Sequence, residues 1–223
     1  MHNAYFNWSS GKDAALAYHR LQQHPEWSIK RLLTTVNQIY QRVTMHGLRI
    51  ELLEQQAQAL GLPLDKLYLP ANPSMEEYDQ LLSQQLDQYV QQGLTHSIFG
   101  DINLQDLRDY REKQLEAVGL QGIFPLWLED TRTLVKESIS LGFKSVIICL
   151  DNRKLDPSFL GRTLDDSFLA DLPPEVDPCG ENGEFHTFCY DGPIFSYPIS
   201  FREGERVLRT YPAPKGNDGQ GVG

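Results

Sequence analysis

The sequence predicts an α/β protein with a doubly wound, mainly parallel sheet and a smaller C-terminal α+β lobe. Strand-like and helix-like patterns alternate through the first two thirds of the chain, and strands separated by helices imply parallel units with right-handed crossovers. After Asp151 the character changes, because prolines interrupt the chain at short intervals. We therefore expect a first domain over residues 1–150, a smaller lobe over 151–211 and a disordered, Gly- and Pro-rich tail over 212–223.

Apolar and β-branched runs predict the strands. The run at residues 3–8 is the first of them, and residues 146–150 form an uninterrupted apolar run typical of a buried strand. Beyond Asp151, residues 185–190 and 194–201 carry strand-forming side chains between turns. In chain order we expect strands at residues 3–8, 29–36, 64–69, 97–102, 146–150, 185–190 and 194–201.

Helices are expected where helix formers or an apolar period near 3.6 residues follow a turn. The segment from residue 13 is rich in Ala and Leu, and the helix before Gly61 ends at a residue that favours a helix C-terminus. Residues 75–89 place apolar side chains at spacings of three and four, which indicates one face packed on a core. The expected helices cover residues 13–23, 48–60, 75–89, 105–118 and 131–140.

Composition limits the partners and the cellular setting. The formal net charge of −10 argues against broad contact with nucleic acid, which depends on Lys and Arg. No apolar run approaches the roughly 20 residues that a membrane helix needs, so we expect no membrane partner. The chain shows no basic-then-apolar leader, and its three cysteines form no CxxC pair, which favours the cytoplasm. The oligomeric state stays open, a homo-oligomer included.

The most informative segment is the turn from the first strand into the first helix, residues 9–13. Such a turn leaves backbone N–H groups unpaired at the positive end of a helix, where phosphate binds readily. Ser9, Ser10 and Gly11 let the backbone approach an anion closely. Lys12 adds a positive charge, and Asp13 is a candidate either to hold Mg²⁺ or to cap the helix. The alternative is an ordinary strand-to-helix turn.

A second group of candidate residues follows the strand expected at 97–102. Asp101 stands at the end of that strand and is a candidate Mg²⁺ ligand beside the first loop. Arg108 and Arg111 lie three residues apart, hence on one helix face, where they could grip phosphate or a substrate carboxylate. The alternative is a capped surface helix held by ion pairs.

The third group lies in the glycine-rich acidic turn that leads into the strand at 185–190. Gly180 shapes the turn, and Glu181 and Glu184 are candidates to bind a metal, a ribose or an amine substrate. His186 lies on the strand and is a candidate to contact the substrate. The alternative is an ordinary turn followed by a structural histidine.

These segments resemble known enzymes. The turn at residues 9–13 resembles the SGGxDS pyrophosphatase loop of the N-type ATP pyrophosphatases, with Ser10 in place of the usual second Gly and Ala14 in place of the final Ser. Taken together and in this order, the motifs resemble the diphthine–ammonia ligase family, including its short archaeal and bacterial forms. The residues that carry the resemblance are 9–13, 45–47, 100–102, Arg108, Glu112, 125–127, 180–188 and 191–193.

The resemblance implies an adenine-nucleotide α-hydrolase-like fold that binds ATP and Mg²⁺. It implies amide formation through an acyl-adenylate, with release of AMP and pyrophosphate. The implied substrates are ATP, a carboxylate on a small molecule or a protein side chain, and ammonia or an amine. Catalytic roles are implied for Lys12, Asp13, Asp101 and Arg108, with Asp13 and Asp101 as metal ligands.

Two other functions stay open. Ala14 lacks a hydroxyl that could contact phosphate or metal, which favours a nucleotide-binding module with little or no catalysis. An adenylating enzyme that acts on tRNA is the third possibility. The acidic net charge and the missing CxxC pair argue against it.

Overall fold

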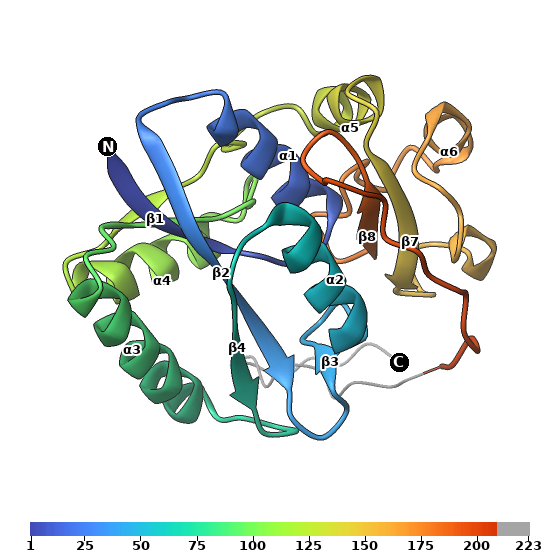
Figure 1. The fold of residues 1–223 in the computed structure, drawn as a ribbon. Helices are drawn as coiled ribbons and strands as arrows, with labels where there is room; N and C mark the ends of the chain where they lie inside the picture. The colour runs from blue at the N-terminus through green and yellow to red at the C-terminus, as the bar shows by residue number, and fades with distance from the viewer. Residues whose placement is uncertain (209–223) are drawn as a thin grey trace.

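The computed structural model describes residues 1–208 and contains a six-stranded main sheet with the order β3-β2-β1-β5-β6, in which β4 also pairs with β2 (Figure 1). Four of its pairings are parallel, and only the short β3 runs antiparallel, against the end of β2. The predicted α/β class and mainly parallel sheet are therefore confirmed. The strands are β1 (His2–Asn7), β2 (Trp27–Asn37), β3 (Arg42–Val43), β4 (Leu64–Leu69), β5 (His96–Ile98) and β6 (Gln121–Ile123).

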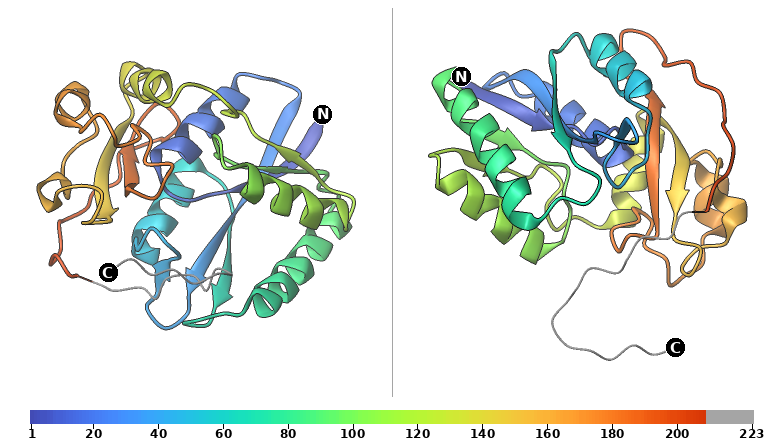
Figure 2. Two further views of the ribbon diagram at one scale, coloured as in Figure 1. Left: turned by 180° about the vertical axis from the view of Figure 1, so that it is seen from behind. Right: turned by 90° about the horizontal axis from the view of Figure 1, so that it is seen from below.

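Helices cover both faces of this sheet (Figure 2). Alternate residues of β1 enter different cores: Ala4 and Phe6 pack with α1, α2 and α5, whereas Tyr5 packs with α3 and α4. Because both faces of β1 are buried at its centre, Ala4, Tyr5 and Phe6 are consecutive apolar residues rather than alternating with polar ones. The helices are α1 (Lys12–Gln22), α2 (Ile50–Leu60), α3 (Met75–Gln91), α4 (Gln105–Glu116), α5 (Thr131–Ser140) and α6 (Asp166–Asp171), with a 3-10 helix at Pro157–Phe159.

The strand expected at residues 146–150 lies outside the main sheet, which corrects the alternating pattern at that point. As β7 (Lys144–Leu150) it pairs antiparallel with β8 (Phe185–Asp191) in a two-stranded sheet of its own. Val146 and Phe188 of this small sheet belong to the same continuous core as Phe6 of β1. The two parts of the chain are thus packed together, and a division into domains at residue 150 stays a prediction.

Two further expectations need correction. Residues 194–201 form no strand, although Ile194 and Ile199 are buried, because the segment turns at Pro193 and Pro198 and packs as an irregular chain. The strand expected at 97–102 ends at Ile98, and the residues after it form a loop. The prediction of a disordered tail at 212–223 lies outside the described residues.

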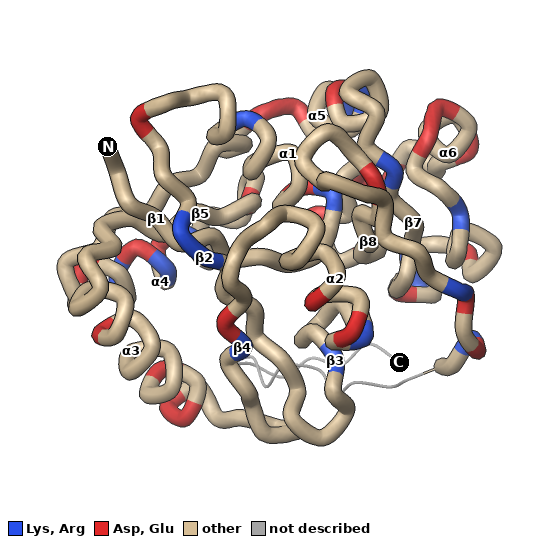
Figure 3. The backbone as a smooth tube through the Cα atoms, in the orientation of Figure 1, with Lys and Arg blue, Asp and Glu red and all other residues tan. Residues whose placement is uncertain are grey.

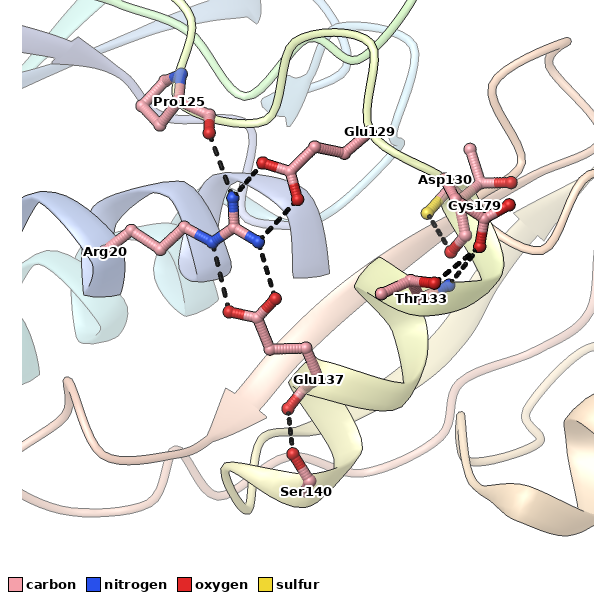
Figure 4. A network of polar contacts seen from close by, with 9 residues as sticks. Arg20, Pro125, Glu129, Asp130, Thr133, Glu137, Ser140 and Cys179 are labelled. Carbon is pink, nitrogen blue, oxygen red and sulfur yellow. Dashed lines mark hydrogen bonds and ion pairs between the residues drawn. The ribbon is translucent and has the colours of Figure 1, made fainter.

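Arg20 of α1 holds the segment between β6 and α5, which connects the two parts of the chain, against α1 (Figure 4). Its guanidinium donates to both carboxylate oxygens of Glu137 at 3.1 and 2.6 Å and pairs with both oxygens of Glu129. It also donates to the carbonyl oxygen of Pro125 at 3.1 Å. The bidentate pairs fix the guanidinium in one orientation, so α1 keeps a defined position relative to α5 and the segment before it.

Basic residues are dispersed over the described chain and interleaved with acidic ones (Figure 3). That nucleic acid is disfavoured as a partner stays a prediction. No helix within residues 1–208 is long and apolar enough to cross a membrane.

Candidate active site

The candidate site lies where β1 and β5 end, at the middle of the main sheet. The two strands are parallel neighbours, so the turn after Asn7 and the loop after Ile98 leave the sheet at the same edge. The strand order reverses direction at this point, which is where open α/β sheets bind ligands. Gly100 lies directly on α1, since a Cβ there would come within 3.0 Å of the backbone of Asp13 and of Ala14. Only glycine lets the two segments approach this closely.

The turn into α1 is shaped by an unusual conformation at Ser10, whose φ is 73°. For a residue with a side chain this region costs roughly 1–2 kcal/mol, which is the physical reason that glycine suits the position. The Ser10 hydroxyl is buried and has no hydrogen-bond partner. Gly11 is the N-cap, and the backbone N–H of Lys12 donates to Oγ1 of Thr187 at 3.0 Å. Strand β8 therefore packs directly against the start of α1.

Lys12 is buried and holds its charge inside the site. Its Nζ donates to Asp13 at 2.7 Å and to the carbonyl oxygen of Cys179. Burial lowers the pKa of Lys12, but Asp13, Cys179 and Glu181 together raise it by more, so the net pKa lies above its ordinary value. A permanently charged ammonium thus lies between the loop at 9–13 and the acidic turn of the C-terminal part.

Asp13 and Glu181 lie near this lysine, and Asp101 lies near both of them. Burial raises the pKa of Asp101; Arg111, at 3.0 Å, opposes the rise and Asp13 adds to it. Burial also raises the pKa of Glu181 to about 7, with Asp13 adding to the rise and Lys12 opposing it. These mutual effects show that Asp13, Asp101 and Glu181 lie within electrostatic reach of one another, an arrangement common at functional sites.

The acidic turn itself is built by Gly180 and Glu184. Gly180 has a φ of 74°, and a Cβ there would lie 2.7 Å from the carbonyl oxygen of Phe185. Glu184 is only 3% exposed, and its carboxylate accepts from the backbone N–H of Asp177 at 3.2 Å and from that of Asn182 at 2.9 Å. The side chain of Asn182 donates to it as well, at 3.1 Å. Glu184 therefore holds the turn from within, while Glu181 faces the loop.

Two histidine rings contact each other beside the loop at 9–13, in a tilted arrangement. The rings of His46 and His186 are 4.5 Å apart at 35°, and a Cβ on Gly11 would lie 3.5 Å from the ring of His46. Burial lowers the pKa of His46 to about 3 and that of His186 to about 4, with the charge of Lys12 contributing to both. Both rings are therefore neutral at pH 7. Nδ1 of His46 is buried and has no hydrogen-bond partner.

The structure separates the two arginines that the sequence put on one helix face. Arg108 lies over the rings of Phe124 and Trp127, 4.6 Å from each centroid, and pairs with Glu112. Arg111 is the residue beside Asp101. The catalytic role of Arg108 stays a prediction, and Arg111 is the arginine that the fold brings to the candidate metal ligand.

The predicted residues of the loop, Asp101, the acidic turn and His186 thus come from distant segments to one region. Arg111, a candidate from the sequence, lies there too, whereas sequence reasoning did not assign site roles to His46, Thr187 or Gln56, which also lie there. The Met45–His46–Gly47 segment was a usable signal for His46. Gln56 and Thr187 gave none, because single polar residues on a helix or strand are common.

Comparison with known families decides the classification. A family model of the diphthamide synthase N-terminal domain matches residues 2–122, and one of the C-terminal domain matches residues 130–211. The chain belongs to the diphthamide synthase family. The boundary between the two matches falls in the segment between β6 and α5 that Arg20 contacts. Together the matches span both parts of the described fold.

Several diphthamide synthase family members are named diphthine–ammonia ligase. The human protein is 34% identical over 116 residues, which is 48% of this chain and 43% of that protein. The zebrafish (Danio rerio) protein is 30% identical over 176 residues, 69% of this chain and 66% of that protein. The chain thus spans less than half the length of the human relative. A solved U34-tRNA thiolase NcsA from Methanococcus maripaludis is 14% identical, with a TM-score of 0.39 over 63% of this chain and 57% of that chain.

The donor set fits Mg²⁺. Within residues 1–208 no three His, Cys, Asp or Glu side chains are grouped as a ready-made metal site. In nucleotide sites, however, Mg²⁺ binds through one or two carboxylates together with phosphates and water. Asp13 and Asp101 are such carboxylates, and Glu181 adds negative charge that a divalent cation would offset. Metal binding by Asp13 and Asp101 stays a prediction.

Proposed function

We propose that the chain is an ATP-dependent ligase that forms an amide from a carboxylic acid and ammonia or an amine through an acyl-adenylate. The observation that carries the proposal is the convergence of Lys12, Asp13, Asp101 and Glu181 at the carboxyl ends of β1 and β5. Relatives in the same family that are named diphthine–ammonia ligase support this class of reaction.

In this proposal the phosphates of ATP bind at the start of α1, over residues 9–13. A carboxylate oxygen of the acid attacks the α-phosphorus, the bond to the bridging oxygen breaks, and pyrophosphate leaves. Ammonia or an amine then attacks the acyl carbon, loses a proton, and AMP leaves. Lys12 stabilises the charge on the departing pyrophosphate, and Mg²⁺, held by Asp13 and Asp101, would offset phosphate charge.

The C-terminal turn provides the other side of the proposed site. Glu181 faces the loop, and with a pKa near 7 it can accept the proton that the attacking amine loses. Gly180 gives the turn its shape, and His186 with His46 forms a neutral wall over Gly11. The acid substrate is defined by class alone, a carboxylate on a small molecule or on a protein side chain.

Binding of ATP is the first expected result. ATP with Mg²⁺ should raise the melting temperature, since a ligand that binds only the folded state stabilises it. Lys12→Ala should reduce that rise, whereas Lys30→Ala, an exposed control, should not. Pyrophosphate release is then measured with ATP, ammonia and a panel of carboxylic acids. If millimolar ATP, AMP and pyrophosphate all leave the melting curve unmoved, the proposed site is wrong.

Ala14 supports a second candidate, an adenine-nucleotide-binding module with little or no catalysis. Ala14 is 2% exposed at the third position of α1, beneath Gly100. A hydroxyl here that bonds pyrophosphate would contribute roughly 1.5–3 kcal/mol, which corresponds to about tenfold to a hundredfold in affinity or rate. Ala14→Ser should therefore increase ATP affinity or pyrophosphate release. No change in either would remove the main support for the binding module.

A further inference from the structure

A buried glutamine of α2 links the loop at 9–13 to strand β8. Gln56 is completely buried, and Oε1 accepts from Nε1 of Trp8 at 2.8 Å. Its Nε2 donates to the carbonyl oxygen of Ser10 at 3.0 Å and to that of Cys189 at 2.7 Å. An indole N–H only donates and a carbonyl only accepts, so the chemistry of the partners fixes which end of the amide faces which.

The carbonyl of Ser10 is held from the inside by two donors. Besides Gln56, the backbone N–H of Cys189 donates to it at 2.9 Å. A trans peptide group is planar, with its C=O and N–H pointing in opposite directions. Because the Ser10 carbonyl points toward α2 and β8, the N–H of Gly11 points away from them, and it donates to Oγ of Ser9 at 3.4 Å.

The orientation of the Ser10–Gly11 peptide depends on contacts with the surrounding residues. Ser10 holds a φ of 73°, which is unfavourable for a residue with a side chain and persists only where surrounding contacts enforce it. Rotation of the Ser10–Gly11 peptide would turn the Gly11 N–H inward and put a carbonyl oxygen at the start of α1. A carbonyl oxygen there would repel phosphate, whereas an N–H attracts it.

We infer that Gln56 is a positioning residue that fixes the Ser10–Gly11 peptide with the Gly11 N–H pointing away from α2 and β8, where phosphate can replace Oγ of Ser9 as its acceptor. The inference rests on the proposed function, because it concerns the loop that is proposed to hold the phosphates of ATP. Strand β8 also helps to fix that loop, because the Cys189 N–H and the Gln56 side chain donate to the same Ser10 carbonyl.

The test compares two glutamines of one helix. Gln56→Met keeps the length of the side chain but removes both donors, and it should weaken binding of Mg²⁺-pyrophosphate about tenfold, equivalent to about 1.4 kcal/mol. Gln58→Met changes an exposed residue of α2 and should leave the affinity unchanged. Gln56→Glu places a carboxylate against two carbonyls, so its affinity should improve as the pH falls and the carboxyl regains a proton to donate. A purely structural role would not produce that pH profile.

A measurement on the unmodified chain decides the matter if Gln56→Met does not fold. The indole N–H resonance of Trp8, identified by its loss in Trp8→Phe, should shift on titration with pyrophosphate, because Gln56 connects it to the loop. A folded Gln56→Met protein with unchanged pyrophosphate affinity overturns the inference. So does an indole resonance that stays fixed while pyrophosphate binds. Both outcomes leave the proposed function intact, whereas failure of the unmodified chain to bind ATP and pyrophosphate overturns that function as well.

Discussion

Glu184→Gln should destabilise the fold by about 2–3 kcal/mol, on the order of 5–10 °C in melting temperature. The carboxylate of Glu184 is buried and accepts from the backbone N–H groups of Asp177 and Asn182 and from the Asn182 side chain. A glutamine presents one acceptor oxygen and an amide NH₂, so one donor loses its partner and faces another donor. Urea unfolding measures the loss.

Glu175→Gln is the matched control, because Glu175 is exposed on the approach to the same turn and should tolerate the change. The comparison also tests the substrate role that the sequence suggests for Glu184. A Glu184→Gln protein as stable as the parent, but with impaired turnover, would contradict the structural role and restore Glu184 to the substrate site.

Local signals predict much of the fold. The strands at β1, β2 and β4 and the helices α1 to α5 follow from apolar runs and helical periods, because those patterns depend on neighbours in the sequence. The partner with which each strand pairs cannot be read from such local patterns. Residues 146–150 are recognisable as a buried strand, yet their neighbour β8 begins 35 residues further on, and nothing local indicates an antiparallel pair outside the main sheet. The apolar residues of 194–201, such as Ile194 and Ile199, similarly look like a strand in the sequence, although the segment forms none.

In the candidate site too, the sequence indicates local features but not which distant residues come into contact. The turn at 9–13 is visible in the sequence because a strand-to-helix turn with Ser, Gly and Lys has its own chemistry. Arg108 and Arg111 share one helix face, and only the packing of Phe124 and Trp127 against Arg108 decides which arginine reaches Asp101.

Glu181 should make the stability of the fold depend on pH. Its folded pKa, near 7, lies above the ordinary value of 4.5, because burial and Asp13 disfavour its charged form. The folded state therefore binds this proton more tightly than the unfolded state. The stabilisation from the protonated Glu181 is fully present below about pH 4.5 and is lost as the pH rises through about 7, a total of about 3 kcal/mol.

The Gln side chain of Glu181→Gln cannot ionise, so the variant keeps at high pH the stability that the parent loses when Glu181 ionises. Its free energy of unfolding should nearly equal that of the parent at about pH 4.5 and exceed it by about 3 kcal/mol at about pH 8. Urea unfolding at both pH values measures the difference, with Glu175→Gln as the exposed control. Mg²⁺ should reduce the advantage of the variant at high pH, because a cation held at Asp13 and Asp101 also offsets the charge of Glu181 in the parent. An advantage of equal size at both pH values would mean that Glu181 does not share charge with Asp13 and Asp101, and the proton-accepting role proposed for it would fail.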